Sequence, residues 1–185
     1  MRIRDTNKQQ RIKEAVVQLI LREGFGGISM NKIAKEAEVS PATIYIYYEN
    51  KDQMLSDIFR DYANRVYDYL FEQIRPDMDG KELIDTLIRG YADYISAHAE
   101  EFGFVEQCSR CPTLAGACSE KDGTCKIFDL LHSYQQRSIL KPFCDVNIAA
   151  VLFYPVRFVA MDQSAYRQKR LNELIDMMQE LLLYP

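Results

Sequence analysis

The stretch that decides the fold is residues 40–48, Ser-Pro-Ala-Thr-Ile-Tyr-Ile-Tyr-Tyr. Ser40 is a typical helix N-cap, and Pro41 suits the first helical position because the N–H that proline lacks would have no partner there. Ile44 and Tyr48 lie four residues apart and therefore share one face of a helix. The pattern predicts a short helix that buries this face. Its outward residues are then Ala42, Thr43 and Tyr47.

A second short helix is predicted just before this one. Ser29 can cap a helix that runs to about Ala37, and a turn of three to four residues connects the two. An earlier helix, capped by Asp5 or Thr6, should end at Gly24. Two short helices joined in this way and braced by a third form a helix-turn-helix, whose second helix can enter a DNA major groove. We therefore predict a DNA-binding head with its motif at about residues 29–48.

The rest of the chain is also predicted to be helical. It shows no sustained alternation of apolar and polar residues and no Asn-Gly or Asp-Gly hairpin signal, whereas apolar residues recur at helical spacing. The expected fold is all-α with about nine helices. We expect domains at 1–50 and 51–185, the second entered through a long linking helix at 51–75. The next expected helix is capped by Asp79. Four further helices are expected at about 100–107, 125–140, 145–161 and 164–183.

The distribution of charged and apolar residues limits the classes of function that the chain can have. The chain has a formal net charge of -4, but residues 1–60 hold ten Lys or Arg against eight Asp or Glu, and residues 61–185 hold thirteen against nineteen. The head is therefore basic relative to the body, as a DNA-contacting head would be. The apolar runs, such as 148–154, fall far short of the roughly 20 residues that span a bilayer. With no signal-peptide pattern at the N-terminus, we expect a cytoplasmic protein.

The head resembles that of the TetR family of bacterial transcriptional regulators. The resemblance covers about fifty residues, and the order of its elements is more specific than a single helix-turn-helix pattern. The residues that carry it are Gly24-Phe25, Ser29-Met30, Ile33-Ala34, Val39-Ser40 and Thr43-Ile44-Tyr45-Ile46-Tyr47-Tyr48-Glu49-Asn50-Lys51. The chain departs from the family pattern at Glu38 and Ala42, where Gly is frequent. A left-handed Glu38 would cost about 1 to 2 kcal/mol.

The resemblance implies roles for individual residues. Ala42 and Thr43 would touch base edges and so decide operator choice, and Tyr47 could take part in that choice. Ser29, Tyr45, Tyr47 and Lys51 would contact phosphates and set the register, while Ser40 caps the helix. For Tyr45 the alternative is packing in the core. The predicted DNA-binding set is Ser29, Ser40, Ala42, Thr43, Tyr45, Tyr47 and Lys51.

For the body, the resemblance implies a ligand-binding and dimerisation domain. The last two helices would form a homodimer interface, and an effector acting on the body would release a repressor from double-stranded operator DNA. The alternative for the apolar stripe from Leu171 to Leu182 is an intramolecular core face. Aromatic residues would surround an effector cavity, or else form ordinary core, and Arg157 would favour an acidic ligand. The predicted effector-binding residues are Tyr91, Tyr94, Phe104, Phe128, Tyr154 and Arg157.

Four cysteines crowd one loop in the pattern C-x2-C-x6-C-x6-C. Thiolates bind Zn²⁺ tetrahedrally, but the second C-x2-C of a zinc ribbon is missing. The alternatives are a redox or electrophile sensor, with Arg110 and Lys126 lowering thiol pKa values, and cysteines with no common role. Cys144 is expected to be a small buried residue. The predicted metal ligands are Cys108, Cys111, Cys118 and Cys125.

Two other classes of function compete with a regulator. A thiol-based enzyme could use the cysteines, but the sequence has no paired His and carboxylate motif and no Gly-rich phosphate loop, so we predict no catalytic residues and no enzyme. A zinc-stabilised helical interaction protein, with a head that no longer binds DNA, is the other alternative. Substitution of Thr43 and Tyr45 would separate this alternative from a DNA-binding regulator.

Overall fold

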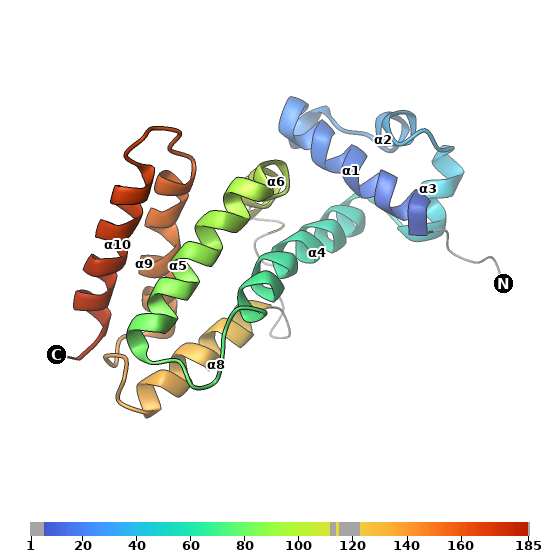
Figure 1. Cartoon of the computed structure of the whole chain (residues 1–185). Coiled ribbons are helices and arrows are strands. Elements are labelled where there is room, and N and C mark those ends of the chain that lie inside the picture. The colour runs from blue at the N-terminus through green and yellow to red at the C-terminus, as the bar shows by residue number, and fades with distance from the viewer. Residues whose placement is uncertain (1–5, 112–113, 115–122, 185) are drawn as a thin grey trace. The chain divides into compact units, whose positions relative to one another are not determined.

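The computed structural model describes residues 6–111, 114 and 123–184. Its contacts divide the chain into two compact units. Unit 1 comprises Met1–Ala63 and Glu100–Ser119, and unit 2 comprises Asn64–Ala99 and Glu120–Pro185. The described part contains nine α-helices and one short 3-10 helix, and no strand is found in it (Figure 1). The all-α prediction is confirmed.

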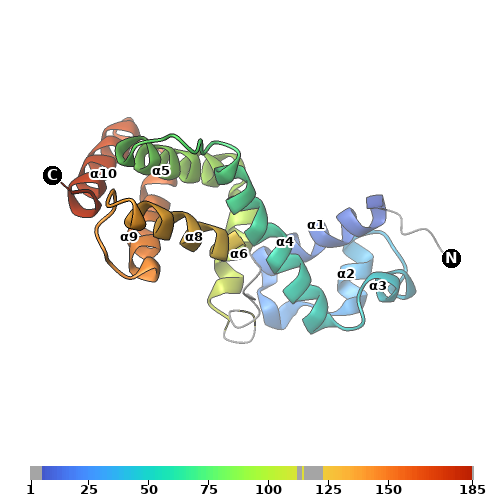
Figure 2. The same ribbon diagram turned by 90° about the horizontal axis from the view of Figure 1, so that it is seen from below.

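Unit 1 contains the three helices of the predicted head. Its elements are α1 (Thr6–Glu23), η1 (Phe25–Gly27), α2 (Met30–Glu36), α3 (Pro41–Tyr47), the first part of α4 (Lys51–Phe71) and nearly all of α6 (Ala99–Ser109). Gly24 ends α1 with φ 69 and ψ -179, a backbone conformation that is essentially restricted to glycine. Helices α2 and α3 lie side by side in both views (Figures 1 and 2).

A single apolar core holds unit 1 together. Helix α1 contributes residues at helical spacing, and α2, α3 and α4 pack their buried faces against it. Phe104 and Cys108 of α6, both fully buried, belong to the same cluster. The most buried side chains of the core include Ile12, Val16, Ile20, Ile33, Ile44, Met54, Ile58 and Tyr62.

The domain boundary differs from the one predicted at residue 50. Met54, Leu55 and Ile58 at the start of α4 are buried in the core of unit 1, so the boundary falls inside this helix, after Ala63. The segment that begins at Glu100 also returns to unit 1, although sequence reasoning assigned it to the body. Helix α4 ends at Phe71 and not near residue 75.

Unit 2 is built around α5 (Gly80–Ala97). Asp79 caps this helix in a reciprocal capping box with Glu82, as the sequence at Asp79 predicts. Helix α5 packs against both α9 (Asp145–Ala160) and α10 (Arg167–Leu182), and α8 (Gly123–Gln136) packs against α9 (Figures 1 and 2). Among the described helices, none has the length and apolar character that crossing a membrane requires.

Candidate nucleic-acid interface

Local hydrogen bonds position the two helices of the motif. Ser29 Oγ accepts a hydrogen bond from the Lys32 amide at 3.3 Å, and Ser40 Oγ accepts one from the Thr43 amide at 3.2 Å. Both serines are therefore N-caps, as predicted, and Pro41 occupies the first turn of α3. Because each cap satisfies a backbone N–H that the helix itself leaves open, the start of each helix is fixed by its own sequence.

The turn between α2 and α3 is a Schellman motif. The Val39 amide donates to the Ala34 carbonyl at 2.9 Å, and the Glu38 amide donates to the Lys35 carbonyl at 3.2 Å. Glu38 has φ 54 and is thus left-handed, so the turn has the geometry that would carry the cost of a left-handed residue. The turn keeps this geometry with a residue that has a side chain where glycine would be unstrained.

Burial divides α3 into two faces. Ile44 is fully buried and Tyr48 is 4% exposed, so both pack into the core of unit 1 as predicted. Tyr45 is 55% exposed, which excludes the alternative that it packs in the core. The predicted contact residues therefore stay available to a partner. Ser29, Ser40 and Ala42 are exposed, and Thr43, Tyr47 and Lys51 are half-buried.

Sequence reasoning missed Ile46, which is 41% exposed on α3. Its apolar side chain made it a candidate for the core, but the spacing of Ile44 and Tyr48 already assigned the buried face. A helix advances about 100° per residue, so Ile46 lies on the side opposite those two residues. That geometry could have identified it. Ile46 belongs to the outward surface of α3 together with Ala42 and Thr43.

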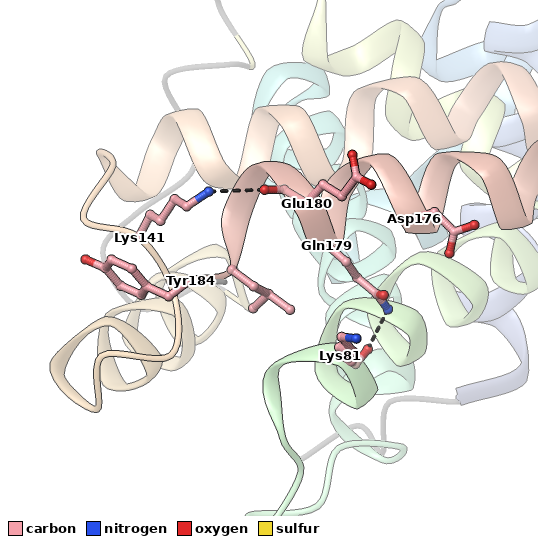
Figure 3. Close-up of a pocket in the computed structure, with 7 residues that line it drawn as sticks. Lys81, Lys141, Asp176, Gln179, Glu180 and Tyr184 are labelled. Carbon is pink, nitrogen blue, oxygen red and sulfur yellow. Dashed lines mark hydrogen bonds between the residues drawn. The ribbon is translucent and has the colours of Figure 1, made fainter.

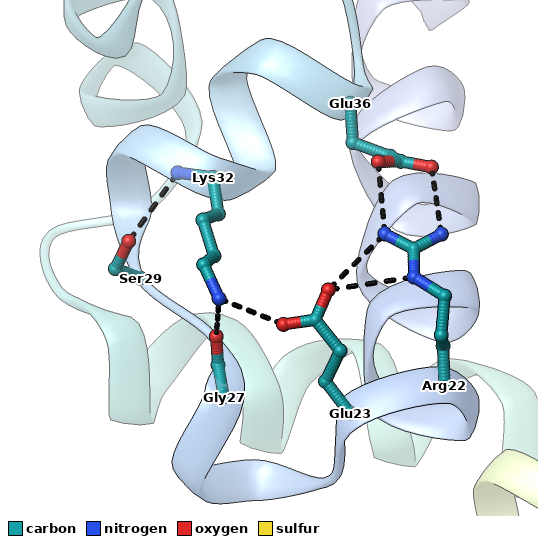
Figure 4. A network of polar contacts seen from close by, with 6 residues as sticks. All are labelled: Arg22, Glu23, Gly27, Ser29, Lys32 and Glu36. Carbon is teal, nitrogen blue, oxygen red and sulfur yellow. Dashed lines mark hydrogen bonds and ion pairs between the residues drawn. The ribbon is translucent and has the colours of Figure 1, made fainter.

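A charged network braces α1 against α2 (Figure 4). Lys32 Nζ lies 2.7 Å from both Glu23 Oε2 and the Gly27 carbonyl, and Arg22 bridges Glu23 at 3.3 Å and Glu36 at 3.2 Å. The hydrogen bond from Lys32 is the main cause that lowers the pKa of Glu23, and the bond to Glu36 is the main cause that raises the pKa of Arg22. Lys32 is thus already paired and holds the turn that precedes Ser29.

The predicted effector residues differ in burial and surroundings. Phe104 lies in the core of unit 1, edge to face with Tyr62, and Tyr154 is 59% exposed on α9. Their role in effector binding stays a prediction. Tyr91 packs edge to face on Phe153. The remaining placements are Tyr94 buried against Tyr69 and His98, Phe128 half-buried on α8, and Arg157 stacked over the Tyr154 ring at 4.7 Å.

Unit 2 does contain an open groove of about 640 Å³ near the end of α10 (Figure 3). It is lined by Lys81, Lys141, Asp176, Gln179, Glu180, Leu183 and Tyr184. Lys141 Nζ donates to the carbonyls of Glu180 and Leu181, and Gln179 donates to the Lys81 carbonyl. Lys141 therefore binds free carbonyls at the C-terminal end of α10, and Gln179 connects α10 to α5. The predicted effector residues are not part of this groove.

The cysteine predictions have mixed outcomes. Cys118 lies outside the described residues, and no group of three His, Cys, Asp or Glu side chains that could hold a metal is found in the part of the chain that the structure describes. The zinc site stays a prediction. Burial, and secondarily Cys111, raises the pKa of Cys108 to about 12. The prediction that nearby cations lower the thiol pKa is therefore wrong for Cys108. The nearby cations are paired, Arg110 with Glu106 and Lys126 with Asp68, and Cys144 is exposed rather than buried.

The geometry of unit 1 defines the class of protein. A capped α2, a tight turn and an α3 with an outward face, braced by α1 and α4, make a helix-turn-helix domain of the DNA-binding type. Residues 12–58 match the family model of bacterial regulatory proteins of the tetR family. Residues 12–58 are therefore similar to the DNA-binding domain of the tetR family of bacterial regulatory proteins.

Similar proteins agree with this assignment. The chain is 38% identical over 79 residues to an uncharacterized HTH-type transcriptional regulator of Haemophilus influenzae, and 31% identical over 81 residues to the fatty acid metabolism regulator protein of Bacillus subtilis. These matches cover 43% and 44% of this chain, and 40% and 42% of the two relatives. The fold is similar to the crystal structure of a TetR family transcription regulator from Marinobacter aquaeolei, with TM-score 0.82, 23% identity and 100% coverage of both chains.

Proposed function

We propose that the protein is a sequence-specific transcriptional regulator that binds double-stranded operator DNA through α3. The observation that carries this proposal is the outward face of α3 on a head that matches the TetR family model. In this proposal α3 enters the major groove, where Ala42 and Thr43 meet base edges. Ser29, Tyr45, Tyr47 and Lys51 contact phosphates and set the register.

The proposed regulator is a homodimer through α9 and α10. These neighbouring helices carry large apolar side chains on their exposed faces, with Phe158 76% exposed, Met161 68% and Met177 60%. Exposed apolar surface of this extent is typical of a protein interface. A twofold pair of heads would read a palindromic site with half-sites about 34 Å apart.

The dimer is tested by sedimentation of Phe158→Glu. A charge at the centre of the apolar face should convert the dimer to a monomer, because it would be buried without a partner. Phe143→Glu, at an exposed phenylalanine outside α9 and α10, is the matched control and should stay dimeric. A wild-type protein that sediments as a monomer at micromolar concentration contradicts the proposed interface.

DNA binding is tested by selection from random duplexes, followed by footprinting on the DNA that flanks the protein's own gene. We expect a palindromic site that is bound at moderate salt in preference to random DNA. Tyr45→Ala should weaken binding to all sequences, whereas Tyr166→Ala, at a tyrosine in unit 2 that is 65% exposed against 55% for Tyr45, should not. Failure to prefer any sequence over random DNA contradicts the proposed function.

The proposed regulator represses transcription and is released by an effector that acts on unit 2. The differential affinity of the effector for the two states of the protein would shift the population away from the DNA-bound state. Fatty acids and their acyl thioesters are the first ligands to test in a gel shift, since one relative is a fatty acid metabolism regulator. A role on chromosomal DNA assigns the protein to the cytoplasm in bacteria, and it requires no catalytic activity.

A further inference from the structure

The outward surface of α3 lacks the side chains that read bases by paired hydrogen bonds. Residues 41–47, Pro-Ala-Thr-Ile-Tyr-Ile-Tyr, contain no Arg, Lys, Asn, Gln, Asp or Glu. Arg and Lys recognise guanine, and Asn and Gln recognise adenine, through two hydrogen bonds each in the major groove. Readout by α3 therefore depends on a different kind of contact.

An apolar strip runs along the outward side of this helix. Ile46 is 41% exposed although its side chain is aliphatic, and it lies opposite the buried Ile44. Ala42, one turn earlier on the same side, is also exposed. The two side chains together present methyl groups at the centre of the surface that would face the groove.

The polar group nearest to this strip is already engaged. Thr43 Oγ1 lies 2.9 Å from Ser40 Oγ, which itself accepts from the Thr43 amide. The hydroxyl is thereby tied to the N-cap of α3, which restricts the directions in which it can bind a base. The tyrosines at 45 and 47 lie to either side of the strip and leave its centre apolar.

The major groove offers one apolar group to such a strip, the C5-methyl of thymine. We propose that Ile46 is a specificity-determining residue that contacts a thymine methyl in each half-site, with Ala42 beside it. The inference rests on the proposed function, because it requires α3 to enter the major groove. In this inference the protein recognises one A·T pair of each half-site through an apolar contact instead of a hydrogen bond.

The test replaces thymine by deoxyuridine, one position at a time, in an operator obtained by selection. This change removes only the methyl group and keeps every hydrogen-bonding group of the base. We expect affinity to fall about fourfold at one position of a half-site, as for the loss of one buried methyl group. With Ile46→Ala the thymine and deoxyuridine operators should bind equally well.

Two further variants control the experiment. Ile46→Val keeps a branched side chain with one carbon less and should show a smaller deoxyuridine effect, while Val146→Ala, an exposed aliphatic residue in unit 2, should keep the full effect. Melting temperature should change little for each variant because these side chains are exposed.

The outcomes separate this inference from the function on which it rests. A protein that selects a sequence but tolerates deoxyuridine at every position overturns the thymine contact alone. An effect that persists in Ile46→Ala assigns the methyl contact to another residue and likewise overturns it. A protein that selects no sequence overturns both proposals.

Discussion

The Phe104 ring lies edge to face on the Tyr62 ring, with centroids 5.7 Å apart. The two residues are distant in sequence, yet both are almost fully buried in the core of the DNA-binding unit. Helix α6 therefore helps to stabilise the head, although it follows helix α5 of unit 2 in the sequence. A substitution in α6 that disturbs this core should therefore lower the stability of the helices that position α3.

Phe104→Ala should destabilise unit 1 by about 3 to 5 kcal/mol, since it leaves a cavity in a packed core. Operator affinity should fall in parallel because the head would be partly unfolded. Phe143→Ala, at a 46% exposed ring in unit 2, should change stability by less than about 0.5 kcal/mol. Chemical denaturation followed by circular dichroism measures both, and equal stability of the two variants contradicts the packing role.

Glu38→Gly should stabilise the protein by about 1 kcal/mol, because glycine adopts the left-handed conformation without strain. The ion pair that Glu38 makes with Arg11 is long, at 3.7 Å, and exposed, so its loss should matter little. Lys35→Gly, in the last turn of α2, is the control and should destabilise by roughly 0.5 to 1 kcal/mol. Thermal melting distinguishes these opposite signs, and a lower melting temperature for Glu38→Gly would count against strain in the turn.

Glu23→Gln should lower stability at neutral pH but not in acid. The folded-state pKa of Glu23 is lowered from its ordinary value of 4.5, chiefly by Lys32, so its contribution is present above that value and is lost as pH falls through the folded-state pKa. The difference in melting temperature between wild type and variant should shrink over that interval. Glu49→Gln is the comparison, since Glu49 makes no ion pair among the described residues. A difference that does not depend on pH contradicts the role of the charge.

Cys108 should be the slowest described cysteine to react with a thiol reagent at neutral pH, and Cys144 the fastest. Burial raises the pKa of Cys108 to about 12 and also blocks access, whereas Cys144 is exposed at the start of α9. Cys144→Ser should remove the fast phase of the reaction, and Cys108→Ser should leave it unchanged. Fast modification of Cys108 in the folded protein contradicts its burial.

The zinc prediction is tested on protein purified without chelator. One zinc per chain with four protected thiols would establish a site, because metal binding removes thiolates from reaction. Protein that carries no zinc and whose other cysteines react freely contradicts it, whatever the reactivity of the buried Cys108. Replacing Cys118 in the same experiment tests the ligand that lies outside the described residues.

The amino-acid sequence by itself determined the starts of α2, α3 and α5. Ser29, Ser40 and Asp79 act on amides three residues away, so their effect is local and does not depend on the rest of the fold. The same is true of the left-handed Glu38, because the hydrogen bonds of its turn close within α2. These local signals were enough to predict the helix-turn-helix and its buried residues Ile44 and Tyr48.

Only the tertiary structure decided where the body aromatics lie and which apolar residues stay exposed. In the sequence, Phe104 and Tyr154 are both aromatic residues within predicted helices. In the structure, Phe104 is buried against Tyr62, whereas Tyr154 lies on an exposed face of α9. An amphipathic pattern shows that a face will be covered without showing by what, because the partner is distant in sequence. The outward position of Ile46 follows from its spacing to Ile44 and Tyr48 and could have been predicted, but the return of α6 to the head required the packed structure.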